Sequence, residues 1–179
     1  MNIFLKSGWA ALILVAGVLS TGSFVTSAVG QVPPLLARPT LPILGKTPIW
    51  LLRDVDGREV KSSDYIGKVV VVDFWATWCP PCRKEIPDYI ALQKKYADRG
   101  LVILGFSMDE APASEVKAFG VKMKVNYPLL MANGATAEAF GGIEGLPTSF
   151  IIDREGNIRH RKVGLTDPDA YEKLIASLL

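Results

Sequence analysis

The chain has 179 residues, of which 49% are hydrophobic and 21% are charged. This composition supplies one ordinary domain with a packed core and excludes global disorder. The 20 Lys and Arg residues against 18 Asp and Glu residues give a formal net charge of +2, which is too balanced for the concentrated basic face of a nucleic-acid-binding protein. Two cysteines and one histidine cannot provide the four Cys/His ligands of a structural zinc site.

The first 30 residues predict export from the cytoplasm. Lys6 precedes an apolar run over residues 9–19, small residues follow it, and no other charge occurs before Arg38. This pattern is typical of a secretory signal peptide, and the uncharged interval is also long enough to remain as a membrane anchor over residues 9–29. A buried N-terminal helix is a third interpretation, but such a helix would carry a polar face. Both export readings place the domain in the periplasm or on the outer face of the cytoplasmic membrane, where disulfides persist.

The next segment, residues 31–46, contains four prolines and shows neither alternation nor a helical period. It predicts an extended linker that leads to one domain over residues 47–179.

Strands and helices are expected to alternate along this domain. β-Branched and apolar runs predict strands over residues 49–52, 59–61, 68–74, 101–106, 127–131, 149–153 and 157–163. Helices are expected from the cysteine motif to about residue 98, over residues 114–123 and 136–140, and after a cap at residues 166–169. This order predicts an α/β domain with a mixed sheet.

The two cysteines form a Cys-x-x-Cys motif at the point where a buried strand gives way to a helix. Cys79 is expected at the helix N-terminus, where the dipole and the free backbone N–H groups stabilise a thiolate. We therefore predict that an accessible Cys79 attacks a partner's disulfide, and that Cys82, tucked beneath it, resolves the mixed disulfide. A purely structural disulfide is disfavoured because closing so small a loop removes little entropy from the unfolded chain. One half of a metal site is disfavoured because the other ligands are missing.

Two motifs carry a resemblance to a known family. Residues 74–82 read FWATWCPPC, and residues 145–148 read GLPT. With their flanking runs, GREVKSSDYIGKVVVVD before the first motif and SFIIDREGNI after the second, they resemble the thioredoxin superfamily, in particular the exported thiol-disulfide proteins of the TlpA, ResA and CcmG type. The resemblance covers about residues 47–179. It implies a thioredoxin fold, with a central mixed sheet flanked by helices, an N-terminal β-hairpin extension and a βαβ-type insert over residues 107–141.

The resemblance also implies a place for the substrate. It identifies Pro147 as a cis-proline that faces the cysteine motif and receives the extended chain of a substrate, although a trans bond would be the default from the sequence alone. Trp78 would cover the motif, and its alternative role is ordinary aromatic packing. The full set of expected substrate-binding residues is Trp78, Pro80, Pro81, Leu146, Pro147 and Thr148.

Two carboxylates are candidates for proton transfer to and from the cysteine thiols. Asp73 lies in the apolar run VVVVDF, where burial should raise its pKa, and it matches the buried acid of thioredoxins. Glu85 follows Cys82 by three residues on the same helix face, and it matches the active-site glutamate of ResA-like proteins. Each could instead be a solvated residue, Asp73 at a strand end and Glu85 beside Arg83 and Lys84.

These observations predict an exported thiol-disulfide oxidoreductase that reduces protein disulfides, such as those of apocytochrome c or of copper-site assembly proteins. The Cys79–Cys82 disulfide would be its only redox centre, without a metal or another cofactor. A membrane thiol-electron carrier would supply electrons. One alternative is a peroxiredoxin-like peroxidase, although those enzymes place their cysteine in a Pro-x-x-x-Thr-x-x-Cys turn. Another is a non-enzymatic peptide-binding module with a permanently closed disulfide.

Overall fold

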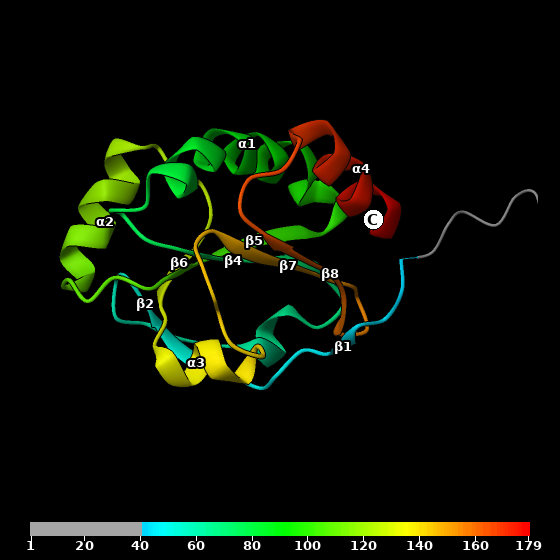
Figure 1. Cartoon of the computed structure of the whole chain (residues 1–179), viewed down its shortest axis with the longest axis horizontal. Coiled ribbons are helices and arrows are strands. Elements are labelled where there is room, and N and C mark those ends of the chain that lie inside the picture. Colours follow the sequence, from blue (N-terminus) through cyan, green and yellow to red (C-terminus); the bar gives the residue numbers. More distant parts are fainter. Residues whose placement is uncertain (1–40) are drawn as a thin grey trace, which may run out of the picture. The chain divides into compact units, whose positions relative to one another are not determined.

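The computed structural model describes residues 41–179, so the predicted signal or anchor and most of the predicted linker lie outside the described residues. An eight-stranded mixed sheet runs through this part of the chain, with helices on both faces (Figure 1). The order of the strands is β1-β8-β7-β4-β5-β6-β2-β3. Their bounds are β1 Gly45–Lys46, β2 Leu51–Asp54, β3 Glu59–Lys61, β4 Val69–Trp75, β5 Leu101–Ser107, β6 Leu129–Met131, β7 Thr148–Ile152 and β8 Asn157–Val163.

The helices divide between the two faces of the sheet. The α-helices are α1 Pro80–Tyr96, α2 Ala113–Lys122, α3 Gly134–Ala139 and α4 Pro168–Leu178, and short 3₁₀ turns occur at η2 Ser62–Tyr65 and η3 Ala97–Arg99. Figure 1 shows α1 and α4 above the sheet and α3 below it. This two-faced arrangement is the thioredoxin fold that the family resemblance implied.

Strand β4 lies at the centre because its residues are apolar on both faces. It pairs with β5 in parallel and with β7 in antiparallel orientation, and every one of its residues is buried. Val69, Val71 and Trp75 pack in the core with the side chains of α1 and α4. Val70, Val72 and Phe74 pack in a second core on the other face. Alternation along the strand therefore places Asp73 on the α1 face.

Segment 107–141, the predicted insert, folds as a crossover. Strands β5 and β6 are parallel, and α2 connects them, which makes a βαβ unit followed by the short helix α3. The N-terminal hairpin of β2 and β3 pairs with the outer edge of β6, so it extends the sheet beyond this crossover.

The start of the sheet differs from the sequence prediction. Gly45 and Lys46, the last residues of the predicted linker, pair with Ile158 and Asn157 of β8, so the sheet begins inside that segment. Helix α1 continues through Pro87. Among residues 41–179, no helix is long and apolar enough to cross a membrane.

Candidate active site

The cysteine motif occupies the N-terminus of α1. Cys79 is the N-cap residue, and Pro80 and Pro81 follow in the first turn, where the fixed φ of proline suits a helix start. The backbone N–H of Cys82 donates a hydrogen bond to Cys79 Sγ at 3.2 Å. The two cysteines form a disulfide with their Cα atoms 5.3 Å apart. The sulfur of Cys79 therefore sits where the helix dipole and one backbone donor can stabilise its thiolate.

Exposure does not separate the two cysteines in the disulfide form. Cys79 is only 4% exposed and Cys82 is 1% exposed, so the prediction that Cys79 is accessible is wrong for this state. The accessible part of the motif is instead Trp78, whose exposed fraction is 66%, together with the exposed Pro80. Trp78 therefore has no role in core packing and forms a surface beside Cys79.

The register of the sheet places Pro147 beside the cysteine loop, the segment that connects the end of β4 to Cys79. Phe74 of β4 pairs with Thr148 of β7 in antiparallel orientation, so the preceding residue, Pro147, stands at the end of β4 from which the loop to Cys79 departs. The Leu146–Pro147 peptide bond is cis, as predicted. Leu146 is half-buried and Pro147 is buried.

Thr148, also expected to bind substrate, is fully buried. Its hydroxyl donates to the carbonyl of Gly145 at 2.6 Å. The side chain thus closes the turn that carries Pro147, and it presents no group to solvent.

Asp73 is buried in the α1 face of the sheet, with an exposed fraction of 4%. Burial raises the pKa of its carboxyl to about 8, the neighbouring Glu85 adds to the rise, and Lys162 opposes it. Oδ1 of Asp73 is buried without a hydrogen-bond partner among the described residues. The prediction of a desolvated acid is confirmed, and the solvated alternative is excluded.

Glu85 is buried as well, so its solvated alternative is also wrong. Its Oε1 accepts a hydrogen bond from Nζ of Lys162, and both side chains are less than one tenth exposed. Burial raises the pKa of Glu85, and the Lys162 ammonium counteracts this rise. Oε2 of Glu85 has no partner among the described residues, so one carboxylate oxygen remains open to a proton.

Lys162 reaches this cluster through the pairing of three strands. Lys162 of β8 lies opposite Ser149 of β7, which lies opposite Asp73 of β4. Directly paired residues share a face of the sheet, so the three side chains form one row toward α1. The sequence analysis missed Lys162, because it is one of three Lys or Arg residues within 159–162 and nothing in the local pattern distinguishes it.

Buried tyrosines enclose the cluster. Tyr89 and Tyr171 are almost fully buried, with ring centroids 6.2 Å apart, and Tyr127 meets the ring of Tyr89 edge-on at 6.4 Å. Burial raises the pKa of all three phenols, so they stay neutral at physiological pH. Asp73 and Glu85 therefore titrate in a largely apolar setting, which is why their pKa values rise.

A second network fixes the loop before Cys79, and sequence reasoning missed it too. The buried Asp109 accepts hydrogen bonds from the backbone N–H of Thr77 at 3.0 Å and from its hydroxyl at 2.5 Å. The hydroxyl of Ser107 also donates to Asp109, at 2.7 Å. These bonds tie the cysteine loop to the end of β5. Among residues 41–179, no group of three or more His, Cys, Asp or Glu side chains could hold a metal ion.

A thioredoxin fold with a Cys-x-x-Cys disulfide at the N-terminus of a helix defines the chain as a thiol-disulfide oxidoreductase. Residues 43–161 match the AhpC/TSA family, and the chain belongs to that family. It is similar to the thiol-disulfide oxidoreductase ResA of Bacillus thuringiensis subsp. konkukian, at 34% identity over 75% of this chain and 78% of the relative. It is also similar to the thioredoxin-like protein YneN of Bacillus subtilis, at 34% identity over 72% of this chain and 76% of the relative.

Solved structures give the same result. A thioredoxin family thiol:disulfide interchange protein from Chlorobium tepidum superposes with a TM-score of 0.68 at 37% identity, over 79% of this chain and 97% of the other. The thioredoxin domain of a thiol-disulfide oxidoreductase from Bacteroides vulgatus has a TM-score of 0.68 at 26% identity, over 78% of this chain and all of the other (100%). These similarities support the fold and the class of reaction together.

Proposed function

We propose that this protein is an exported reductant of protein disulfides. The observation that carries the proposal is the Cys79–Cys82 disulfide at the N-terminus of α1, which lies in one buried cluster with the side chains around Asp73 and Glu85. A purely structural disulfide does not need buried ionisable groups beside it, and ionisable groups with perturbed pKa values cluster at functional sites.

In the first step, the Cys79 thiolate attacks one sulfur of the substrate disulfide. A bond forms between Cys79 Sγ and that sulfur, and the other substrate sulfur leaves as a thiolate. Substrate would lie over the exposed Trp78 and Pro80, beside the half-buried Pro81 and Leu146. The extended chain would align along Pro147. Because the Thr148 hydroxyl is already bonded to Gly145, Thr148 would act by holding this turn.

In the second step, the Cys82 thiol loses its proton and attacks Cys79 Sγ. The Cys79–Cys82 disulfide forms, the second substrate sulfur leaves, and the substrate has gained two electrons. The proton needs a buried acceptor. Asp73, with a pKa of about 8, is partly ionised near neutral pH and can both take and return it. Glu85 would assist, since Lys162 pairs with its Oε1 and leaves Oε2 without a partner among the described residues.

The direction of the reaction follows from the two prolines. A proline has no N–H, so Pro80 and Pro81 leave the N–H of Cys82 as the donor that Cys79 Sγ receives. With so few donors, the pKa of the Cys79 thiol should be only moderately depressed, and the reduced form is less stabilised than in strongly oxidising relatives. This favours a reductant.

The proposed setting is outside the cytoplasm, with the chain exported or anchored through residues 9–29. Substrates would be proteins such as apocytochrome c or copper-site assembly proteins. The reductant needs a supply of electrons, and a membrane thiol-electron carrier would provide them by reducing the Cys79–Cys82 disulfide. No cofactor besides this disulfide is required. The relatives of the ResA type support this setting.

Equilibration with a glutathione redox buffer tests the proposal. We expect a reduction potential closer to about −270 mV, the value of thioredoxin, than to about −120 mV, the value of a strong oxidase. A potential above about −180 mV would assign the protein as an oxidant or an isomerase. Failure of mild reductant to release two thiols would favour the peptide-binding alternative, and consumption of peroxide at a rate above disulfide exchange would favour a peroxidase.

A further inference from the structure

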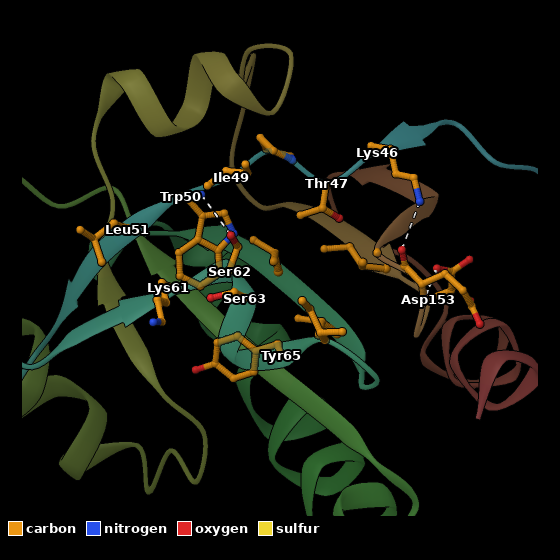
Figure 2. Close-up of a pocket in the computed structure, with 17 residues that line it drawn as sticks. Lys46, Thr47, Ile49, Trp50, Leu51, Lys61, Ser62, Ser63, Tyr65 and Asp153 are labelled. Carbon is orange, nitrogen blue, oxygen red and sulfur yellow. Dashed lines mark hydrogen bonds between the residues drawn. The ribbon is translucent and has the colours of Figure 1, made fainter.

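A cavity of about 550 Å³ lies on the face of the sheet that is opposite to α1 (Figure 2). Val70 and Val72 of β4 and Ile152 of β7 line one side, and Trp50 and Tyr65 line another. This volume is typical of a small-molecule site. Alternation along β4 turns Val70 and Val72 away from the face that carries Asp73, so the cavity is separate from the cysteine site.

Two buried polar atoms at this cavity have no hydrogen-bond partner among residues 41–179. They are the indole Nε1 of Trp50 and Oγ1 of Thr47, two of the five such side-chain atoms within residues 41–179. Trp50 as a whole is 7% exposed. An indole N–H can only donate, and a buried donor without an acceptor is costly. An occupant with an acceptor oxygen would remove this cost.

The rest of the lining restricts what the occupant can be. The rings of Trp50 and Tyr65 lie 6.1 Å apart with a 32° tilt, and aliphatic side chains complete the wall, which suits a flat apolar ring system. The entrance is apolar too, since Ile49 is 95% exposed and Ile66 is 78% exposed.

Three of the four charged side chains that line the cavity, all but Glu155, already have partners. Lys46 donates to the carbonyl of Glu155 at 3.2 Å, Lys61 lies 4.0 Å from Asp64, and Asp153 pairs with Arg159 at 2.8 Å. An anionic ligand would have to compete with the partners of Lys46 and Lys61 and would lie near the carboxylates of Asp153 and Glu155, so a neutral molecule fits the site better than an anion.

We propose that this cavity binds a neutral, flat aromatic molecule with a carbonyl oxygen, which accepts a hydrogen bond from Trp50 Nε1. The hydroxyl of Thr47 provides a second polar contact. Binding here leaves the cysteine site open, because the two sites lie on opposite faces of the sheet. The cavity thus adds a ligand site that thiol-disulfide exchange itself does not require.

A matched pair of probes tests the proposal on the full chain, namely 2-acetylnaphthalene and 2-ethylnaphthalene, which differ in the carbonyl. The readout is the NMR signal of the Trp50 indole proton, assigned by its loss in Trp50→Phe. We expect the ketone to move this signal downfield and to bind about fivefold more tightly than the hydrocarbon, as one hydrogen bond of ordinary net strength would give. The rate of disulfide exchange should not change.

The variants separate the hydrogen bond from the apolar contact. Trp50→Phe should keep the affinity for the hydrocarbon and lose the preference for the ketone. Tyr96→Phe, an aromatic change on the α1 face, is the control and should leave both affinities unchanged. Equal binding of the two probes to the wild-type chain would overturn the proposal, whether or not Trp50→Phe folds. Failure of both probes to bind would overturn it as well.

Discussion

Replacement of Lys162 by methionine tests the buried ion pair directly. Methionine keeps an unbranched side chain of similar size but removes the ammonium that donates to Glu85. Both side chains of the pair are less than one tenth exposed, and a buried carboxylate that loses its partner is strongly destabilising. We therefore expect Lys162→Met to lower the free energy of unfolding, with a size set by the ionisation of Glu85.

The ordinary pKa of a glutamate carboxyl sets an upper limit for the ionisation part of this loss. The variant can avoid a buried unpaired charge by protonating Glu85 in the folded state, so its folded pKa rises further above the ordinary value of 4.5. A raised pKa of a carboxyl means that stability falls as pH rises above that ordinary value. At about 1.4 kcal/mol per pH unit, the ionisation cost cannot exceed about 3.4 kcal/mol at pH 7 and about 0.7 kcal/mol at pH 5.

Urea unfolding of the disulfide form at pH 5 and pH 7 measures this effect. Lys162→Met should be destabilised by about 2 to 3 kcal/mol at pH 7 and by much less at pH 5. The double variant Lys162→Met/Glu85→Gln is the control, and it should recover at least half of the loss at pH 7 because no buried charge remains. A loss that is the same at both pH values, or no rescue by Glu85→Gln, would refute the ion-pair account.

Three further predictions concern the cysteines, the buried acid and the loop. Cys82→Ser should accumulate mixed disulfides through Cys79 that gel electrophoresis without reductant detects, while Cys79→Ser should form none; the opposite result would exchange the two roles. Asp73→Asn should be more stable than the wild type, and the gap should grow by about 2 kcal/mol between pH 5 and pH 7, because a carboxyl with a folded pKa of about 8 loses stability as pH rises from about 4 to about 8. The same variant, and Glu85→Gln, should slow thiol exchange near neutral pH by about 100-fold; unchanged rates in both and in the double variant would leave these acids without a catalytic role. Asp109→Asn should weaken the two hydrogen bonds to Thr77 and lower the exchange rate with unchanged pH dependence, and a shifted pH profile would contradict a purely positioning role.

Contiguous stretches of the sequence determined much of this protein. The motif around Cys79 and Cys82 predicted the reaction, because the helix start and the pair of thiols lie within a few residues of each other. The run of residues 68–74, apolar except for Lys68 and Asp73, predicted a central strand and a desolvated Asp73, since a strand that is buried on both faces has no polar alternation. Both features depend on neighbours in sequence, so they are visible without a fold.

Contacts between distant segments were decided by the tertiary structure alone. Asp109 reaches Thr77 across 32 residues, and Lys162 reaches Glu85 across 77 residues. The exposure of side chains was also decided by the tertiary structure. Cys79 is buried, although its position at the start of a helix predicted that solvent could reach it.

The pairing of Lys162 with Glu85 shows most clearly why the sequence alone could not predict such contacts. A β-bulge lies between Ile151 and Ile152 in the pairing of β7 with β8, where Ile152 faces Ile158 but Ile151 faces His160. Without this extra residue, the register counted from the turn would set Arg161 opposite Ser149, and Lys162 would point to the other face. A shift of one residue between two strands thus decides which basic side chain meets Glu85, and the local sequence pattern of β8 does not encode that shift.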